Sequence, residues 1–149
     1  YALYRVRPNG KDRQAIFVAD TKVTLDAAAY CVIEDNQVFL TRSDGEKTLI
    51  IKGKIDGEET LLTAVPEPNR IDTPMNKVGN WLYYAEKNKV YKINVMEKGR
   101  KQLVYQFENG EQGDVKYVNS ILIYHDGILL SAFEKRVFIK NGGTVINID

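Results

Sequence analysis

Few residues of this chain carry the side chains that catalysis and metal binding most often use. His125 is the only histidine and Cys31 the only cysteine, which excludes a two-histidine ligand set and an intrachain disulfide. Structural zinc of the usual kind is excluded as well, because such sites take at least two cysteines. The sequence also lacks the Gly-x-Ser-x-Gly elbow, the His-Glu-x-x-His motif and the P-loop. We therefore predict a protein with no catalytic residue, no metal site and no cofactor.

The single histidine and cysteine have simpler interpretations. His125 stands in the run His125-Asp126-Gly127, which is typical of an exposed turn. Cys31 follows Tyr30 and precedes Val32, so we expect it to be buried and inert. Asn9 and Asp44 stand in glycine-containing turns, where we expect their side chains to accept hydrogen bonds from nearby backbone N–H groups.

A pair of carboxylates is the one catalytic arrangement that stays open. Two carboxyl groups can act as acid and base, or acid and nucleophile, in glycan cleavage. Asp20, Asp72 and Asp114 lie in predicted connectors, but their spacing does not indicate that they converge. A glycan hydrolase or lyase, completed by residues outside this chain, is therefore an alternative to a binding protein and to a purely structural segment.

Ligand-binding residues are expected in the longest connector, which spans residues 65–76. Three of the four prolines lie there, and proline cannot donate a hydrogen bond to a β-ladder. Because loops on a rigid scaffold often carry function, Asn69, Arg70 and Asp72 are predicted ligand contacts. Trp81, which opens a strand-like run, is a further candidate beside its expected packing role.

The composition of the chain limits the classes of partner that we expect it to bind. The chain has 149 residues, enough for one domain with a full core. Its 21 basic and 20 acidic residues are mixed along the chain, which gives no pull toward nucleic acid or anionic membranes. The cluster of Lys98, Arg100 and Lys101 lacks the interleaved aromatic residues of a nucleic-acid surface and reads as a solvated turn. No apolar run approaches the roughly 20 residues that span a bilayer.

The elements that would position these residues are β-strands. Valine, isoleucine, threonine and aromatic residues fill short runs, and glycine, asparagine and aspartate separate them. The clearest unit covers residues 77–105, with strands at 81–85, 90–95 and 102–105. An alignment of Val38, Val90 and Val137 superimposes this unit on two others.

The alignment predicts equivalent turns and strands in the three units. The turns are 35–36, 87–88 and 134–135, and a further strand precedes each hairpin, at 22–25, 77–78 and 121–124. The turn His125-Asp126-Gly127 joins the last of these strands to the next, and its Asp-Gly pair is a hairpin signal because it tolerates positive φ. Each complete unit then has about four antiparallel strands.

The repeat predicts a domain organisation. A half-unit covers residues 1–20, and complete units cover about 21–64, 65–107 and 108–149. A repeat of about 40–50 residues with four antiparallel strands is typical of a β-propeller blade. A β-trefoil, which is also built from repeats, is the alternative. It is disfavoured because a strand that runs into a turn occurs four times, at residues 4–10, 39–45, 90–99 and 137–142, and because the chain opens with half a unit.

Short motifs of the chain are similar to a bacterial β-propeller family of unknown function, distantly related to the YWTD propellers of lipoprotein receptors. The motifs are Gly79-Asn80-Trp81-Leu82-Tyr83-Tyr84, Val90-Tyr91-Lys92-Ile93 and Tyr4-Arg5-Val6-Arg7-Pro8-Asn9-Gly10. The YWTD tetrapeptide itself is absent, and Leu82-Tyr83-Tyr84-Ala85 stands in its place. The resemblance implies a secreted or surface-attached bacterial protein, thus an extracytoplasmic or cell-surface location, and no catalytic residues.

Together these observations predict an all-β, β-propeller segment of about three and a half four-stranded antiparallel blades. We expect a non-catalytic scaffold that binds a protein or a glycan through its inter-blade loops. Because propellers close with about four to eight blades, remaining blades or further copies of the chain are expected to complete the ring. The start at Tyr1 rather than Met leads us to expect a processed mature chain or a fragment.

Overall fold

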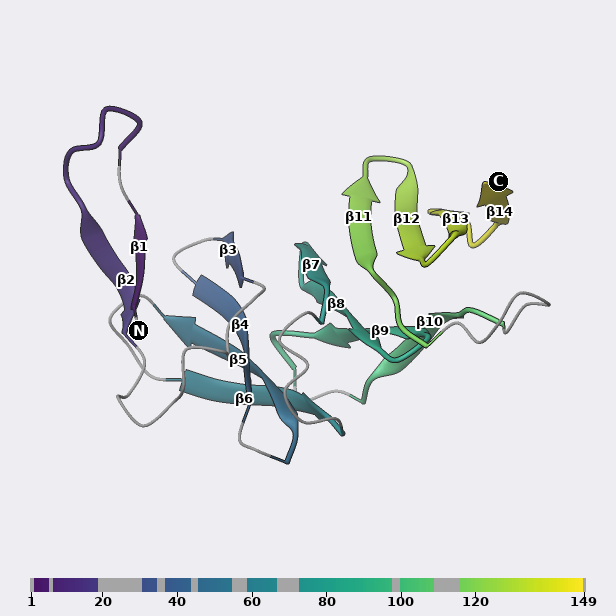
Figure 1. Cartoon of the computed structure of the whole chain (residues 1–149), viewed down its shortest axis with the longest axis horizontal. Helices are drawn as coiled ribbons and strands as arrows, with labels where there is room; N and C mark the ends of the chain where they lie inside the picture. Colours follow the sequence, from purple (N-terminus) through teal and green to yellow (C-terminus); the bar gives the residue numbers. More distant parts are fainter. Residues whose placement is uncertain are drawn as a thin grey trace. The chain divides into compact units, whose positions relative to one another are not determined.

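The structure, a computed structural model, describes residues 2–5, 7–18, 31–34, 37–43, 46–54, 59–66, 73–97, 100–108 and 116–148. The regular elements within these ranges are β-strands, arranged in antiparallel sheets (Figure 1). The chain divides into two compact units, residues 1–71 and 72–149.

The first unit contains a two-stranded sheet and a four-stranded sheet. In the smaller sheet, β1 (Ala2–Arg5) pairs with β2 (Gln14–Val18). The larger sheet has strands in chain order, and they are β3 (Cys31–Glu34), β4 (Gln37–Ser43), β5 (Thr48–Lys54) and β6 (Glu59–Val65). Val38, Phe39 and Ile50 are fully buried there.

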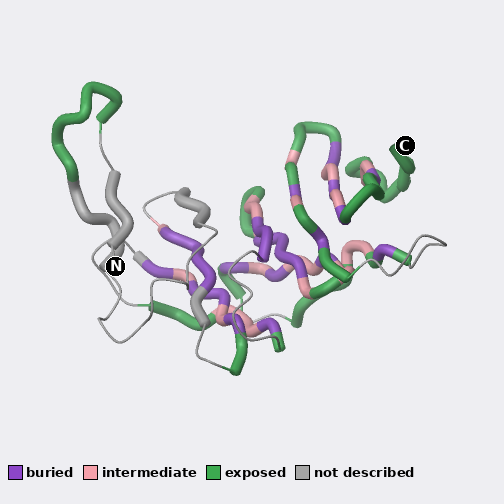
Figure 2. The backbone as a smooth tube through the Cα atoms, in the orientation of Figure 1, coloured by how far each residue is buried: buried purple, intermediate pink, exposed green. Residues whose placement is uncertain are grey.

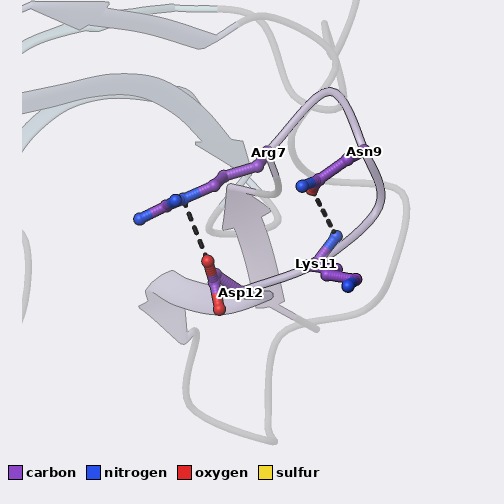
Figure 3. Close-up of polar contacts among 4 residues, drawn as sticks. All are labelled: Arg7, Asn9, Lys11 and Asp12. Atoms are coloured by element: carbon purple, nitrogen blue, oxygen red, sulfur yellow. Dashed lines mark hydrogen bonds and ion pairs between the residues drawn. The ribbon is translucent and has the colours of Figure 1, made fainter.

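The loop between β1 and β2 is held by short-range polar contacts (Figure 3). The Lys11 backbone N–H donates to Asn9 Oδ1 at 3.0 Å, which confirms the turn role predicted for Asn9. Arg7 Nε lies 2.9 Å from Asp12 Oδ2. Gly10 and Asp12 both have positive φ, so this loop reverses through left-handed backbone at two places. Asp44, the other predicted turn residue, lies outside the described residues.

The second unit contains two four-stranded sheets, each with its strands in chain order. The first sheet has β7 (Met75–Val78), β8 (Trp81–Glu86), β9 (Lys89–Asn94) and β10 (Gln102–Gln106). The second has β11 (Ser120–Tyr124), β12 (Gly127–Ala132), β13 (Lys135–Lys140) and β14 (Val145–Ile148).

One hydrophobic core joins these two sheets. Tyr83, Ala85 and Val90 come from the first sheet, and Leu130, Ala132 and Val137 from the second, with Phe107, Val118 and Ile121 completing the buried set. The Asn76 side-chain amide also donates to the Ile121 carbonyl, at 3.3 Å. In Figure 2, β8 is largely buried, whereas β14 is exposed along its length. Within the described residues, the second sheet therefore contributes β11, β12 and β13 to the buried core, and β14 is its exposed edge strand.

The predicted alignment is correct at Val38 and Val90 but wrong by one residue at Val137. The β8–β9 hairpin closes at the pair Glu86 and Lys89, and β12–β13 closes at Ala132 and Lys135. Lys87 and Phe133, which begin these turns, share a φ near +55°. Val90 therefore corresponds to Arg136, and the turn lies at 133–134 instead of 134–135. A match of residue type does not fix the register of a strand, because a shift of one residue moves each side chain to the opposite face of the sheet.

The predicted turn His125-Asp126-Gly127 is one residue shorter in the structure. Tyr124 pairs with Gly127, so His125 and Asp126 form the turn and Gly127 is the first residue of β12. Gly127 does not have a positive φ. A Cβ there would lie 2.3 Å from the Ile139 carbonyl oxygen, so the glycine permits close approach of β13.

The unit at 21–64 differs from the others in its strand positions. The hairpin of β3 and β4 corresponds to β8–β9, but two strands follow it in its sheet where one follows β9. The additional strand, β6, was not predicted, although its apolar run Leu61-Leu62 is β-compatible. The predicted strand at 22–25, and the side chains of Tyr30 and Cys31, lie outside what the structure describes.

Burial of Tyr83 predicts a pH dependence of stability. Desolvation raises the pKa of its phenol above 10.0. The folded state thus keeps the neutral phenol at a pH where the unfolded chain ionises, so this contribution is complete below about pH 10 and is lost as pH rises through the folded pKa. We expect wild type to lose stability more steeply than Tyr83→Phe between about pH 9 and 11 in urea unfolding. Equal slopes would contradict the assignment.

Candidate functional site

A groove of about 490 Å³ lies between the end of β10 and the strands β13 and β14. Its lining comes from β10 and the residues that follow it, from the β12–β13 turn, and from the outer two strands of the second sheet: Tyr105, Gln106, Phe107, Glu108, Glu134, Lys135, Arg136, Val137, Asn147 and Ile148. A volume of this size is ordinary for ligand sites in proteins.

Phe107 fixes the β10 side of the groove. It is buried and packs edge-on against Tyr105, with ring centroids 5.0 Å apart and an interplanar angle of 86°. Its backbone N–H donates to the Asn88 carbonyl at 2.9 Å, and its own carbonyl accepts from Asn88 Nδ2 at 2.7 Å. This reciprocal pair ties the segment after β10 to the β8–β9 turn, so the groove has a fixed wall.

The opposite wall is the tight turn between β12 and β13. Asn119 Oδ1 accepts a hydrogen bond from the Phe133 backbone N–H at 2.5 Å, which supports the positive φ of Phe133. Lys135 then reaches across the groove, where its Nζ donates to the Glu108 carbonyl at 2.6 Å. The two walls are therefore connected directly by a charge-assisted hydrogen bond.

The groove presents charges of both signs beside apolar surface. Glu108, Glu134, Lys135 and Arg136 are exposed, whereas Val137 at the base is buried and Tyr105 is half-buried. Both β10 and β14 are edge strands of their sheets. Mixed charges next to sheet edges suit the main chain and side chains of an extended polypeptide.

The residues predicted from sequence as ligand contacts do not meet in this groove. Trp81 is half-buried on β8, where Lys92 Nζ lies 4.7 Å from the centre of its ring, and it does not line the groove. Asn69, Arg70 and Asp72 lie outside the described residues, as do the alternative carboxylates Asp20 and Asp114.

The other candidates from the sequence have structural surroundings. His125 is exposed in the β11–β12 turn, with its Nδ1 3.7 Å from Asp126 Oδ1. In the basic cluster, Lys101 Nζ pairs with Glu86 at 2.5 Å and lies 4.4 Å from the centre of the Tyr91 ring. Among the described residues, no group of three or more His, Cys, Asp or Glu side chains could hold a metal ion. No helix in this part of the chain is long and apolar enough to cross a membrane.

Comparison with known proteins bears on the fold. No protein family and no curated protein matches the sequence. A chain of the nidogen/laminin complex aligns with 99% of this chain and 54% of its own length, at 11% identity and a TM-score of 0.67. Streptogramin B lyase aligns with 97% of this chain and 46% of its own length, at 14% identity and a TM-score of 0.61. These structures are β-propellers. The chain has a β-propeller fold.

The propeller assignment settles the alternative fold. The β-trefoil is wrong, because the strands form separate four-stranded sheets that match propeller blades. Tricorn protease also aligns with 99% of this chain and 14% of its own length, at 13% identity and a TM-score of 0.63. The chain thus spans about half the length of the nidogen/laminin and lyase chains, and less of the protease. At these identities the likeness concerns the fold alone.

The groove could not be predicted from the sequence. Residue 105 ends a predicted strand and residue 107 ends a predicted unit, but no role is predicted for Phe107. An aromatic residue directly before a polar connector, and the charged run Glu134-Lys135-Arg136 at a turn, were the available signals. Neither shows that the two segments meet, because they are joined only by the packing of the two sheets.

Proposed function

We propose that this protein is a non-catalytic propeller scaffold that binds a partner protein in the groove between β10 and the β13–β14 strands. The supporting observation is that two edge strands, β10 and β14, border a groove whose lining carries charges of both signs. The proposed ligand is an extended segment of the partner. Its backbone would add to the free edge of β10, and its side chains would contact Tyr105 and the charges of the turn.

The β10 side of the groove is already ordered without a ligand, and this favours the binding of an extended segment. The reciprocal hydrogen bonds of Phe107 and Asn88 hold the segment after β10, so little ordering would be needed on association. Arg136 is exposed, and its guanidinium can pair with a carboxylate of the ligand. We therefore expect selected ligands to contain an acidic residue beside apolar ones.

The proposal is tested by selecting ten-residue peptides from a displayed library on the immobilised chain. Affinity is then measured by calorimetry for wild type and for Arg136→Glu. Reversing this charge should weaken binding of an acidic peptide by about tenfold or more, because repulsion between two carboxylates replaces the attraction between Arg136 and the peptide carboxylate. Lys140→Glu is the matched control, because Lys140 is an exposed cation on the same strand and lies outside the groove.

Equal losses in the two variants would refute the groove as the binding site. Failure to select any peptide, while a glycan array gives specific binding, would replace the protein ligand by a glycan. The lyase and protease among the similar structures show that the propeller fold also occurs in enzymes. Turnover of a bound glycan would favour that alternative.

Further parts of the proposal come from the sequence. Asn69, Arg70, Asp72 and Trp81 are proposed as additional ligand contacts in the inter-blade loops. We also propose that remaining blades or further copies of the chain complete the propeller ring, in the organisation of a half-blade and three blades. An extracytoplasmic or cell-surface location belongs to the same proposal and is supported by the resemblance of the motifs around Tyr4 and Trp81.

A further inference from the structure

Phe133 is an aromatic residue in the β12–β13 turn, and most of its surface is open to solvent. It is 77% exposed, the largest exposed fraction among the large hydrophobic residues that the structure describes. Its ring makes no aromatic or cation–π contact within the described part of the chain. A single exposed apolar residue is ordinary, so exposure alone assigns Phe133 no role.

The backbone of this turn disfavours phenylalanine at position 133. The pair Ala132 and Lys135 closes the hairpin, so the turn consists of Phe133 and Glu134. The φ angle is +55° at Phe133 and is not positive at Glu134, which is the pattern of a type II′ turn. Glycine is favoured at the first position of that turn, because a side chain there is strained. The hydrogen bond that the Phe133 N–H donates to Asn119 Oδ1 stabilises this conformation.

The repeat shows that this position stays exposed when another sheet follows. Lys87 is the counterpart of Phe133, because it begins the β8–β9 turn with a φ of +54°. The β7–β10 sheet packs against the β11–β14 sheet through their shared core, and Lys87 is nevertheless exposed. A further sheet packed in the same way would therefore leave Phe133 exposed as well. The counterpart also shows that the turn forms with a lysine, so the fold does not require an aromatic ring here.

Phe133 directly precedes a run of residues that line the groove, 134–137. Arg136, within this run, is exposed and is the proposed partner of a ligand carboxylate. Aromatic residues and arginine are enriched at the centres of protein interfaces, whereas lysine and glutamate are depleted there. An exposed ring and an exposed guanidinium three residues apart in the chain therefore favour a ligand that offers an apolar side chain and a carboxylate.

We propose that Phe133 anchors the partner segment and determines its specificity, a role that rests on the proposed function of the groove. The bound segment carries a large apolar side chain that packs on the Phe133 ring, beside the acidic residue that pairs with Arg136. Because Asn119 holds the turn before binding, little ordering of the turn is needed on association.

Peptides selected on the wild-type chain, from the ten-residue library described above, test this role. We expect them to be enriched in leucine, isoleucine, phenylalanine or tryptophan. Phe133→Ala should weaken the binding of such a peptide by about tenfold or more in calorimetry. Met96→Ala is the matched control, because Met96 is 65% exposed in the turn after β9 and does not line the groove. It should leave the affinity unchanged.

A double-mutant cycle separates direct contact from a structural effect. In the second change, alanine replaces the large apolar residue of the selected peptide. If that side chain packs on the Phe133 ring, the loss of affinity for both changes together should be smaller than the product of the two single losses. Independent losses, which multiply, would overturn the proposal.

Circular dichroism establishes that each variant is folded. If Phe133→Ala does not fold, Phe133→Gly carries the same expectation, because glycine is favoured at this turn position. Unchanged affinity in the folded Phe133 variant, while Arg136→Glu still weakens binding, overturns the role of Phe133 and leaves the groove as the binding site. Unchanged affinity in both variants, or a failure to select any peptide, overturns the proposed function as well.

Discussion

Phe107→Ala is expected to lower the free energy of unfolding by about 3–5 kcal/mol. The side chain is 1% exposed and belongs to the core that joins the two sheets of the second unit. Its removal would leave a cavity next to Tyr105 and release the edge-on ring contact. The backbone bonds to Asn88 prevent the segment from collapsing into that space, so the cost should lie near the upper end.

Urea unfolding monitored by circular dichroism measures this effect. Phe133→Ala is the matched control, because Phe133 is 77% exposed in the β12–β13 turn and should change stability by about 0.5 kcal/mol or less. Phenylalanine and alanine both adopt the positive φ at position 133 at a similar cost, so backbone strain should not contribute to the difference in stability. A Phe107→Ala variant as stable as the control would mean that the two sheets do not share this core.

Gly127→Ala is expected to destabilise the protein by about 3 kcal/mol through overpacking. The added Cβ would lie 2.3 Å from the Ile139 carbonyl oxygen and 2.7 Å from Phe138 Cζ. The carbonyl belongs to the neighbouring strand and cannot move without disturbing the β12–β13 ladder. The Phe138 ring, displaced from Gly127, would also lose its position beside Tyr124.

Gly142→Ala serves as the comparison in the same sheet. Nothing lies within 4 Å of a Cβ built at Gly142, and its φ is not positive. The change should therefore alter stability by about 0.5 kcal/mol or less. Thermal unfolding of both variants gives the test, and equal melting temperatures for the two would show that β12 and β13 do not approach as closely as described.

Local hairpins could be predicted from the sequence because their signals are local. Glycine, asparagine and aspartate between β-prone runs located the reversals near residues 36, 88 and 125 to within a residue. Asn9 in its turn was predicted correctly for the same reason, since its side chain bonds the backbone two residues away. The all-β class and the approximate blade repeat followed from these hairpins.

Register and long-range packing could not be predicted in this way. Val137 and Arg136 are adjacent, and which of them corresponds to Val90 depends on the closing pair of the turn, not on residue type. Gly127 carries a turn signal in sequence, yet it is needed for contact with Ile139. The groove joins residue 107 to residues 134–137, and that juxtaposition is produced by sheet packing alone.

We propose that the groove between β10 and the β13–β14 strands binds an extended segment of a partner protein. Hydrogen–deuterium exchange of the chain with and without a selected peptide tests it most directly, because an added strand protects the backbone amides that it pairs with. We predict new protection in the edge strand β10, at residues 102–106, and little change in β13, which is already paired with β12 and β14. Protection confined to other strands, such as β3 to β6, would contradict the claim.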